Sequence, residues 1–273
     1  MASWLSITQI FITYIAPLIF LLSLFGCLMN TILFSTVYMY RSQPCTFFLL
    51  IAAISRFVHL LNTGLSRGLA IMIGKDVTLV SPVLCKTRSY LINVCLGISM
   101  TCECLATVDR FLVTSRNANF RRMSNIKLAY RITVVLLAFW LIENVPCFLF
   151  IDIISANICA IHTNFWMIYS KYVINWVSLT IVPLIICISF GLLAYRNMHS
   201  LKNSRQLQGS DRQLSYMILA QVIITIIPII PSAFFFTYSS SAISINEAAE
   251  KGVEYFVFNF INTLTGFFFG VSR

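Results

Sequence analysis

The chain has 273 residues, of which 59% are hydrophobic and only 10% are charged, and its mean hydropathy is +0.86. A composition this apolar excludes a soluble globular domain of this length and indicates a membrane protein. The formal net charge is +10, but most basic residues lie in short segments between apolar runs, as the positive-inside rule requires, so the charge does not indicate nucleic-acid binding.

Continuous apolar runs, most of them longer than about 18 residues, follow one another along the chain. Such runs are typical of membrane-spanning helices, whereas a membrane barrel shows short segments of alternating polarity. We therefore predict an all-α bundle of seven transmembrane helices that forms a single domain over residues 1–273. The predicted spans are Ile10–Val37, Phe47–Ile73, Lys86–Thr114, Leu128–Ile154, Tyr172–Met198, Leu214–Tyr238 and Gly252–Val271.

Basic residues are distributed unequally between the two sides of this predicted bundle. The segments after the first, third and fifth spans, with the C-terminus, hold twelve, and the opposite side holds five. The positive-inside rule then predicts an outside N-terminus and a cytoplasmic C-terminus. The twelve are Arg41, Arg110, Arg116, Arg121, Arg122, Lys127, Arg131, Arg196, Lys202, Arg205, Arg212 and Arg273, and the five are Lys75, Lys86, Arg88, Lys171 and Lys251.

Four ionisable residues fall inside predicted spans, where such groups are functional candidates. They are Arg56, His59, Glu103 and Glu143. Three roles stay open for Glu103: an internal structural bond, a part in switching, or a place on an ion path. Its candidate partners on other spans are Asn30, Ser55, Arg56 and Asn262.

Of nine cysteines, only Cys85 and Cys159 lie on the predicted outer side, where the environment is oxidising. A disulfide between them is the natural inference, and two unpaired thiols are the alternative. Cys45 lies at the inner face. The other six fall inside spans and are interpreted as packing residues.

The third predicted span carries a thiol near one end and a charged pair at the other. Cys85 precedes Arg110 by 25 residues, which is about 37 Å along an α-helix and close to the thickness of a bilayer with its interfaces. With Asp109 and Phe111, the charged end reads Asp-Arg-Phe. It resembles the Asp-Arg-Tyr end of the third helix in rhodopsin-like G-protein-coupled receptors. The resemblance implies a bridge from Cys85 to the second outer loop and an arginine that faces a G protein.

Further positions are similar to hinge and packing residues of that family: Asn30 in the first span, Trp140 in the fourth, Pro183 in the fifth and Pro231 in the sixth. Asp211 opens the sixth span, where many members carry an acid. The resemblance implies an inactive state in which Arg110 bonds to Asp109, to Asp211 or to both.

The chain also departs from the family pattern. Ser55 replaces the acidic residue of the second span, and Ile229 stands where the sixth span has a tryptophan. The seventh span lacks the Asn-Pro-x-x-Tyr motif. Together these features resemble divergent invertebrate peptide-receptor-like or orphan members of the family.

The resemblance also narrows the class of ligand. Ile92 stands where amine receptors carry an aspartate, and the segment from Gly252 to Arg273 contains no lysine for a retinal Schiff base. Glu247, Glu250 and Glu254 in the last outer loop could attract a cationic peptide, and a solvated acidic loop is the alternative. Ile92 and these three glutamates are the ligand-facing candidates.

We therefore expect a multi-pass plasma-membrane receptor that transduces binding of an extracellular ligand to a cytoplasmic heterotrimeric G protein. A degenerate receptor that couples poorly is the first alternative, and a small transporter or channel is the second, although we find no internal repeat. Neither enzymatic activity nor a cofactor or metal is expected, because the three histidines lie in separate segments.

Overall fold

The computed structural model describes residues 6–7, 9–36, 43–73, 81–115, 117–154, 158–161 and 163–201, with short helical pieces between 220 and 267. Most of the predicted sixth and seventh spans, 214–238 and 252–271, therefore lies outside the described residues. The fold below is that of the described part of the chain.

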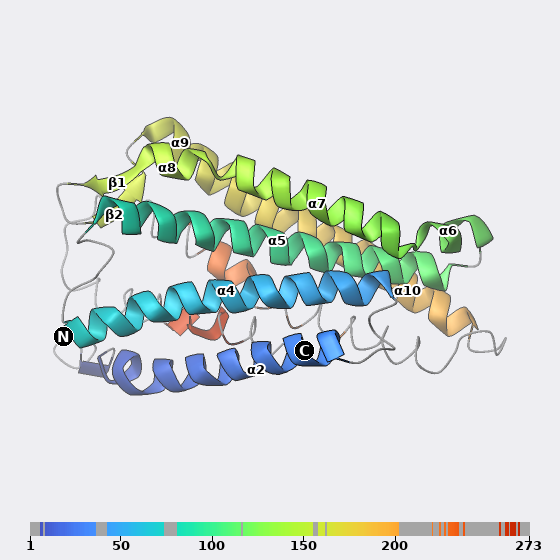
Figure 1. The fold of residues 1–273 in the computed structure, drawn as a ribbon, viewed down its shortest axis with the longest axis horizontal. Coiled ribbons are helices and arrows are strands. Elements are labelled where there is room, and N and C mark those ends of the chain that lie inside the picture. The colour runs from blue at the N-terminus through green and yellow to red at the C-terminus, as the bar shows by residue number, and fades with distance from the viewer. Residues whose placement is uncertain are drawn as a thin grey trace.

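Five helical stretches in the described ranges are long and apolar enough to cross a membrane. Each exceeds the roughly 20 residues that a bilayer requires, and the protein is accordingly an α-helical, multi-pass membrane protein. Figure 1 shows the stretches lying side by side along the long axis of the molecule. They are Phe11–Thr36, Pro44–Ser66, Pro82–Thr114, Ile126–Phe150 and Asn164–His199.

These stretches contain most of the secondary-structure elements. The first is a π-helical turn, η1 (Phe11–Ile15), followed by α2 (Ala16–Thr36). The second lies within α4 (Pro44–Ile73), and the third is α5 (Pro82–Thr114). The fourth joins α7 (Ile126–Glu143) to α8 (Pro146–Phe150), and the fifth runs through α9 (Asn164–Ile168), the π-helical η3 (Tyr169–Ile181) and α10 (Val182–Leu201).

Helix starts follow local sequence signals. Pro82 lies in the first turn of α5, where its missing N–H costs nothing. The short helix α6 (Ala118–Met123) is capped by Asn117, whose side chain accepts a hydrogen bond from the Asn119 N–H at 3.0 Å. Asn125 caps α7 in the same way, accepting from the Lys127 N–H at 3.0 Å. Each cap satisfies an N–H that has no partner within its helix.

The fourth span is shorter than the sequence predicted. We expected a helix to Ile154, but the α-helix is interrupted after Glu143 and helical structure ends at Phe150. Pro146 has no N–H to continue the ladder and instead begins α8. The next four residues form β1 (Ile151–Ile154), which pairs antiparallel with β2 (Ile158–Ile161). The three isoleucines of β1 are β-branched and favour a strand once the helix has stopped.

Helix α5 lies at the centre of the described bundle. In the most apolar 18-residue segment of α5, 61% of the residues are buried. The corresponding fraction in the fourth span is 17%. The core around α5 includes Phe34, Leu49, Ile98 and Trp140. Helix α5 packs mainly against α4 and α10, whereas many of the large apolar side chains of α7 are exposed.

A glycine sets the approach of α7 to α5. The indole of Trp140 lies against Gly97, and a methyl group at that position would overlap the ring. The Trp140 Nε1–H donates to the Thr101 Oγ1 at 3.2 Å, and Thr101 in turn donates to the Gly97 carbonyl at 2.7 Å. The two spans are therefore joined by a close contact whose polar groups are satisfied.

Candidate functional site

One end of α5 is covalently tied to the β1–β2 hairpin. Cys85 and Cys159, 74 residues apart, form a disulfide with their Cα atoms 5.9 Å apart, which is the pairing expected from the sequence. Nearby, Lys86 Nζ lies 3.7 Å from Asp152 Oδ2, with both side chains partly exposed. Such an exposed ion pair contributes little to stability. The disulfide is therefore the stronger of the two links between the hairpin and this end of α5.

The opposite end of α5 carries the buried Asp109–Arg110 pair. An N–H of Arg110 donates to Asp109 Oδ2 at 3.1 Å, and the side chains of Arg110 and Asp109 are 3% and 6% exposed. The same guanidinium donates to Gln43 Oε1 at 3.2 Å. Gln43 immediately precedes α4, so Arg110 connects the end of one span to the start of another. Hydrogen bonds of a charged group are stronger than neutral ones.

The carboxylate of Asp109 has a second partner. Its Oδ1 accepts a hydrogen bond from the Ser124 hydroxyl at 2.6 Å. Ser124 follows α6 and lies just before the cap of α7. Three segments that are distant in sequence therefore converge on Asp109 and Arg110, and the pair has a defined geometry at this end of the bundle.

Phe111, the third residue of the Asp-Arg-Phe sequence, packs among aromatic rings. Its centroid lies 5.4 Å from that of Phe190 on α10 and 6.3 Å from that of Phe120 on α6. Tilted rings at these distances attract one another. The charged pair is thus flanked by an apolar cluster that connects α5, α6 and α10.

A second buried ion pair lies within the membrane-spanning part of the bundle. Arg56 on α4 pairs with Glu103 on α5, and their side chains are 3% and 5% exposed. Arg56 is thus one of the partners considered for Glu103 from the sequence, whereas another of them, Asn262, lies outside the described residues. Two opposite charges at this depth stabilise each other only as a pair, because either one alone would be a desolvated charge.

The remaining predicted residues lie apart from Arg110. Asn30 is half-buried on α2, Ile92 is half-buried on α5, and Pro231 is exposed on a short helical piece. Pro183 is buried at the start of α10, where its carbonyl accepts a weak hydrogen bond from the Cys104 thiol at 3.8 Å. Trp140 belongs to the α5–α7 contact described above. Lying outside the described residues are Asp211, Glu247, Glu250 and Glu254.

The sequence did not identify the neutral partners of the charged pair. Gln43 and Ser124 are polar residues at loop–helix junctions, where capping roles are common, and no spacing rule connects either one to Arg110. The only local signal was their position beside a helix start. Across the described ranges, no group of three or more His, Cys, Asp or Glu side chains is placed to hold a metal ion.

Comparison with known proteins gave no match, either to a family model or to a curated protein sequence. The fold and the site therefore carry the functional argument by themselves.

Proposed function

We propose that this chain is a seven-span receptor of the rhodopsin-like G-protein-coupled class, resident in the plasma membrane with its N-terminus outside. In this role it binds an extracellular ligand, with a peptide as one candidate, and acts on a cytoplasmic heterotrimeric G protein. The observation that carries the proposal is the layout of α5. A disulfide-tied hairpin lies at one end of this 33-residue helix and a buried, hydrogen-bonded Asp109–Arg110 pair lies at the other.

The mechanism follows from what holds Arg110. Its bonds to Asp109 and Gln43 keep the guanidinium inside the bundle and favour the packing seen here. A ligand that binds a second packing more tightly would shift the population toward it. In the proposed active packing the inner end of the sixth span moves outward, Arg110 turns from its intramolecular partners, and a cleft opens for the G protein. Asp211 is the proposed second partner in the inactive packing.

A degenerate receptor that couples poorly is the second candidate. It is favoured by the absence of Asn-Pro-x-x-Tyr from the last predicted span and by Ser55 in place of an acid. These departures leave the Asp-Arg-Phe end intact, so this candidate would bind ligand while activating a G protein weakly.

The test is guanine-nucleotide exchange in membranes from cells that express the chain with a panel of G proteins, with and without a cationic peptide library. Arg110→Ala should lower basal and stimulated exchange while surface expression remains. Arg122→Ala is the matched control, because Arg122 lies exposed on α6 at the same end of the bundle. Equal exchange by both variants and the parent contradicts the role of Arg110. No exchange by the parent with any G protein supports the poorly coupling receptor instead.

A further inference from the structure

A shallow apolar hollow lies on the lipid-facing side of the bundle, where α7 crosses α5. Its walls come from Ile132, Val135, Leu136 and Phe139 on α7, with Thr101 of α5 and the edge of Trp140 at one end. Val135 and Phe139 are 69% and 55% exposed. Because α7 is one of the least buried spans, this face points toward lipid.

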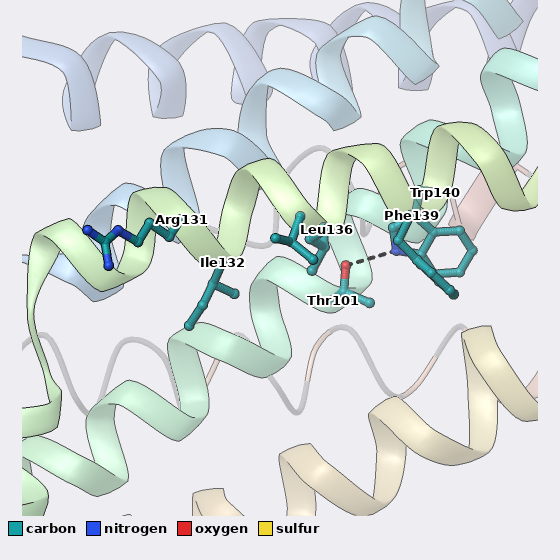
Figure 2. Close-up of a pocket in the computed structure, with 7 residues that line it drawn as sticks. Thr101, Arg131, Ile132, Leu136, Phe139 and Trp140 are labelled. Atoms are coloured by element: carbon teal, nitrogen blue, oxygen red, sulfur yellow. Dashed lines mark hydrogen bonds between the residues drawn. The ribbon is translucent and has the colours of Figure 1, made fainter.

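The hollow has one charged end and one neutral end. Figure 2 shows Arg131 near one end of the row, with Trp140 and Thr101 hydrogen-bonded to each other at the opposite end. That bond leaves the Trp140 end without a free donor. Among the residues that line the hollow, the charged one is Arg131, whose side chain is exposed. Lys127, also exposed, lies four residues earlier and therefore on the same face of α7.

Nothing acidic in the described surroundings balances these two cations. No ion pair within the described residues involves Lys127 or Arg131. The sequence from 117 to 142 contains no Asp or Glu, and the nearby carboxylate of Asp109 is buried and bonded to Arg110 and Ser124. Within the described part of the chain, the charge at this end of the hollow is therefore open to an external anion.

The length of the hollow matches one leaflet of a bilayer. Arg131 and Trp140 are nine residues apart on one helix, which is about 13.5 Å at 1.5 Å per residue. Half of a 30 Å hydrocarbon core is about 15 Å. With Arg131 at the headgroup boundary, Trp140 lies near the middle of the membrane, so the apolar wall between them spans the depth of a single acyl chain.

We propose that this hollow binds an anionic phospholipid, with its phosphate on Arg131 and Lys127 and one acyl chain along Ile132, Val135, Leu136 and Phe139. Charge selects the class of lipid. A zwitterionic headgroup would bring a second cation toward Lys127 and Arg131, and near a membrane surface each basic residue favours an anionic lipid. We expect about a tenfold preference for an anionic over a zwitterionic lipid with the same chains.

The site needs both of its parts. A water-soluble anion would reach the two cations but leave the apolar wall unfilled, and a second protein copy would have to bring its own anion to this depth. The lipid site lies on the membrane-facing surface and is independent of the proposed receptor function.

The experiment is native mass spectrometry of the full chain in detergent, with phosphatidylglycerol and phosphatidylcholine of identical acyl chains as probes. The parent should retain phosphatidylglycerol about tenfold more strongly. The double variant Lys127→Gln/Arg131→Gln should lose this preference, and Arg131→Gln alone should lose most of it. The control Arg121→Gln/Arg122→Gln removes the same charge from α6, outside the hollow, and should keep the preference. Val135→Trp, which fills the wall, should lower retention of both lipids.

Four results would overturn the proposal. The first is an unchanged preference for phosphatidylglycerol in the Lys127→Gln/Arg131→Gln variant. The second is an equal loss of that preference in the Arg121→Gln/Arg122→Gln control, which would indicate only a diffuse attraction between the basic end of the bundle and anionic lipid. Displacement of the lipid by millimolar inorganic phosphate would assign the cations to a soluble anion. A lipid-free dimer whose formation Val135→Trp abolishes would assign the face to a second copy. Each variant is checked by its thermal transition and by its intact disulfide, and no readout depends on G-protein coupling.

Discussion

The Arg56–Glu103 pair offers the sharpest test of how this bundle is held together. Glu103→Gln keeps the shape of the side chain and removes its charge, which leaves the Arg56 guanidinium buried without its carboxylate. Arg56→Met removes the other charge and retains most of the apolar volume. The variant that carries both changes leaves no charge at this depth, so the three variants and the parent form a double-mutant cycle.

The magnitude follows from burial. With side-chain exposures of 3% and 5%, water cannot replace the lost partner, and breaking such a pair costs about 3–5 kcal/mol. For chains of this size 1 kcal/mol corresponds to about 2–4 °C, so each single variant should melt about 6–20 °C below the parent. The double variant should recover at least half of this loss, because replacing a buried pair as a whole is often neutral.

The chain provides its own reporter of unfolding. Seven cysteines are free in the described residues, and all of them except Cys147 are buried. A thiol-reactive fluorophore in detergent should therefore label the six buried thiols only as the protein melts. Lys86→Gln is the matched control. It breaks a pair with a 3.7 Å separation whose side chains are 25% and 54% exposed, and it should change stability by less than about 1 kcal/mol.

Two results would refute this reasoning. If Glu103→Gln melts within about 2 °C of the parent, as the control should, the pair does not hold α4 and α5 together. If the double variant melts as low as the worse single variant, the loss comes from packing and not from an uncompensated charge.

Other predictions test the two ends of the bundle and its closest helix contact. Non-reduced peptide mapping should find the Cys85–Cys159 link, and its loss by substitution should cost about 2–5 kcal/mol; alkylation of both thiols on surface protein would contradict it. An N-terminal tag should be stained on intact cells and a C-terminal tag only after permeabilisation, whereas staining of both on one side would remove the receptor proposal. Asp211→Asn should raise basal nucleotide exchange, and an unchanged basal rate would exclude this residue from the switch. Gly97→Ala should cost about 1–3 kcal/mol by overpacking the indole beneath it, whereas Gly68→Ala, with open space around it, should not lower the melting temperature.

Much of the helical architecture is a property of the sequence itself. A bilayer core demands about 20 consecutive apolar residues with all backbone groups bonded within the segment, so an uninterrupted apolar run specifies a helix without reference to its neighbours. For this reason each of the five described spans overlaps its predicted range, although the fifth begins at Asn164, before the predicted Tyr172, and the second ends at Ser66, before the predicted Ile73. The helix starts at Asn117 and Asn125 are equally local, since a cap needs only the next two residues.

Tertiary structure decided which side chains meet. The apolar run places Glu103 inside a span but does not fix the rotation of α5 against α4, and that rotation brings Glu103 to Arg56. Gln43 and Ser124 reach Asp109 and Arg110 because the start of α4 and the α6–α7 junction happen to adjoin the end of α5. The end of the fourth helix was missed for a similar reason. An apolar run ending in Ile-Asp-Ile-Ile is compatible with helix or strand, and pairing with β2, which the disulfide ties to α5, determines the outcome. Contacts between distant segments depend on how the helices pack in three dimensions, and a local sequence pattern does not determine that packing.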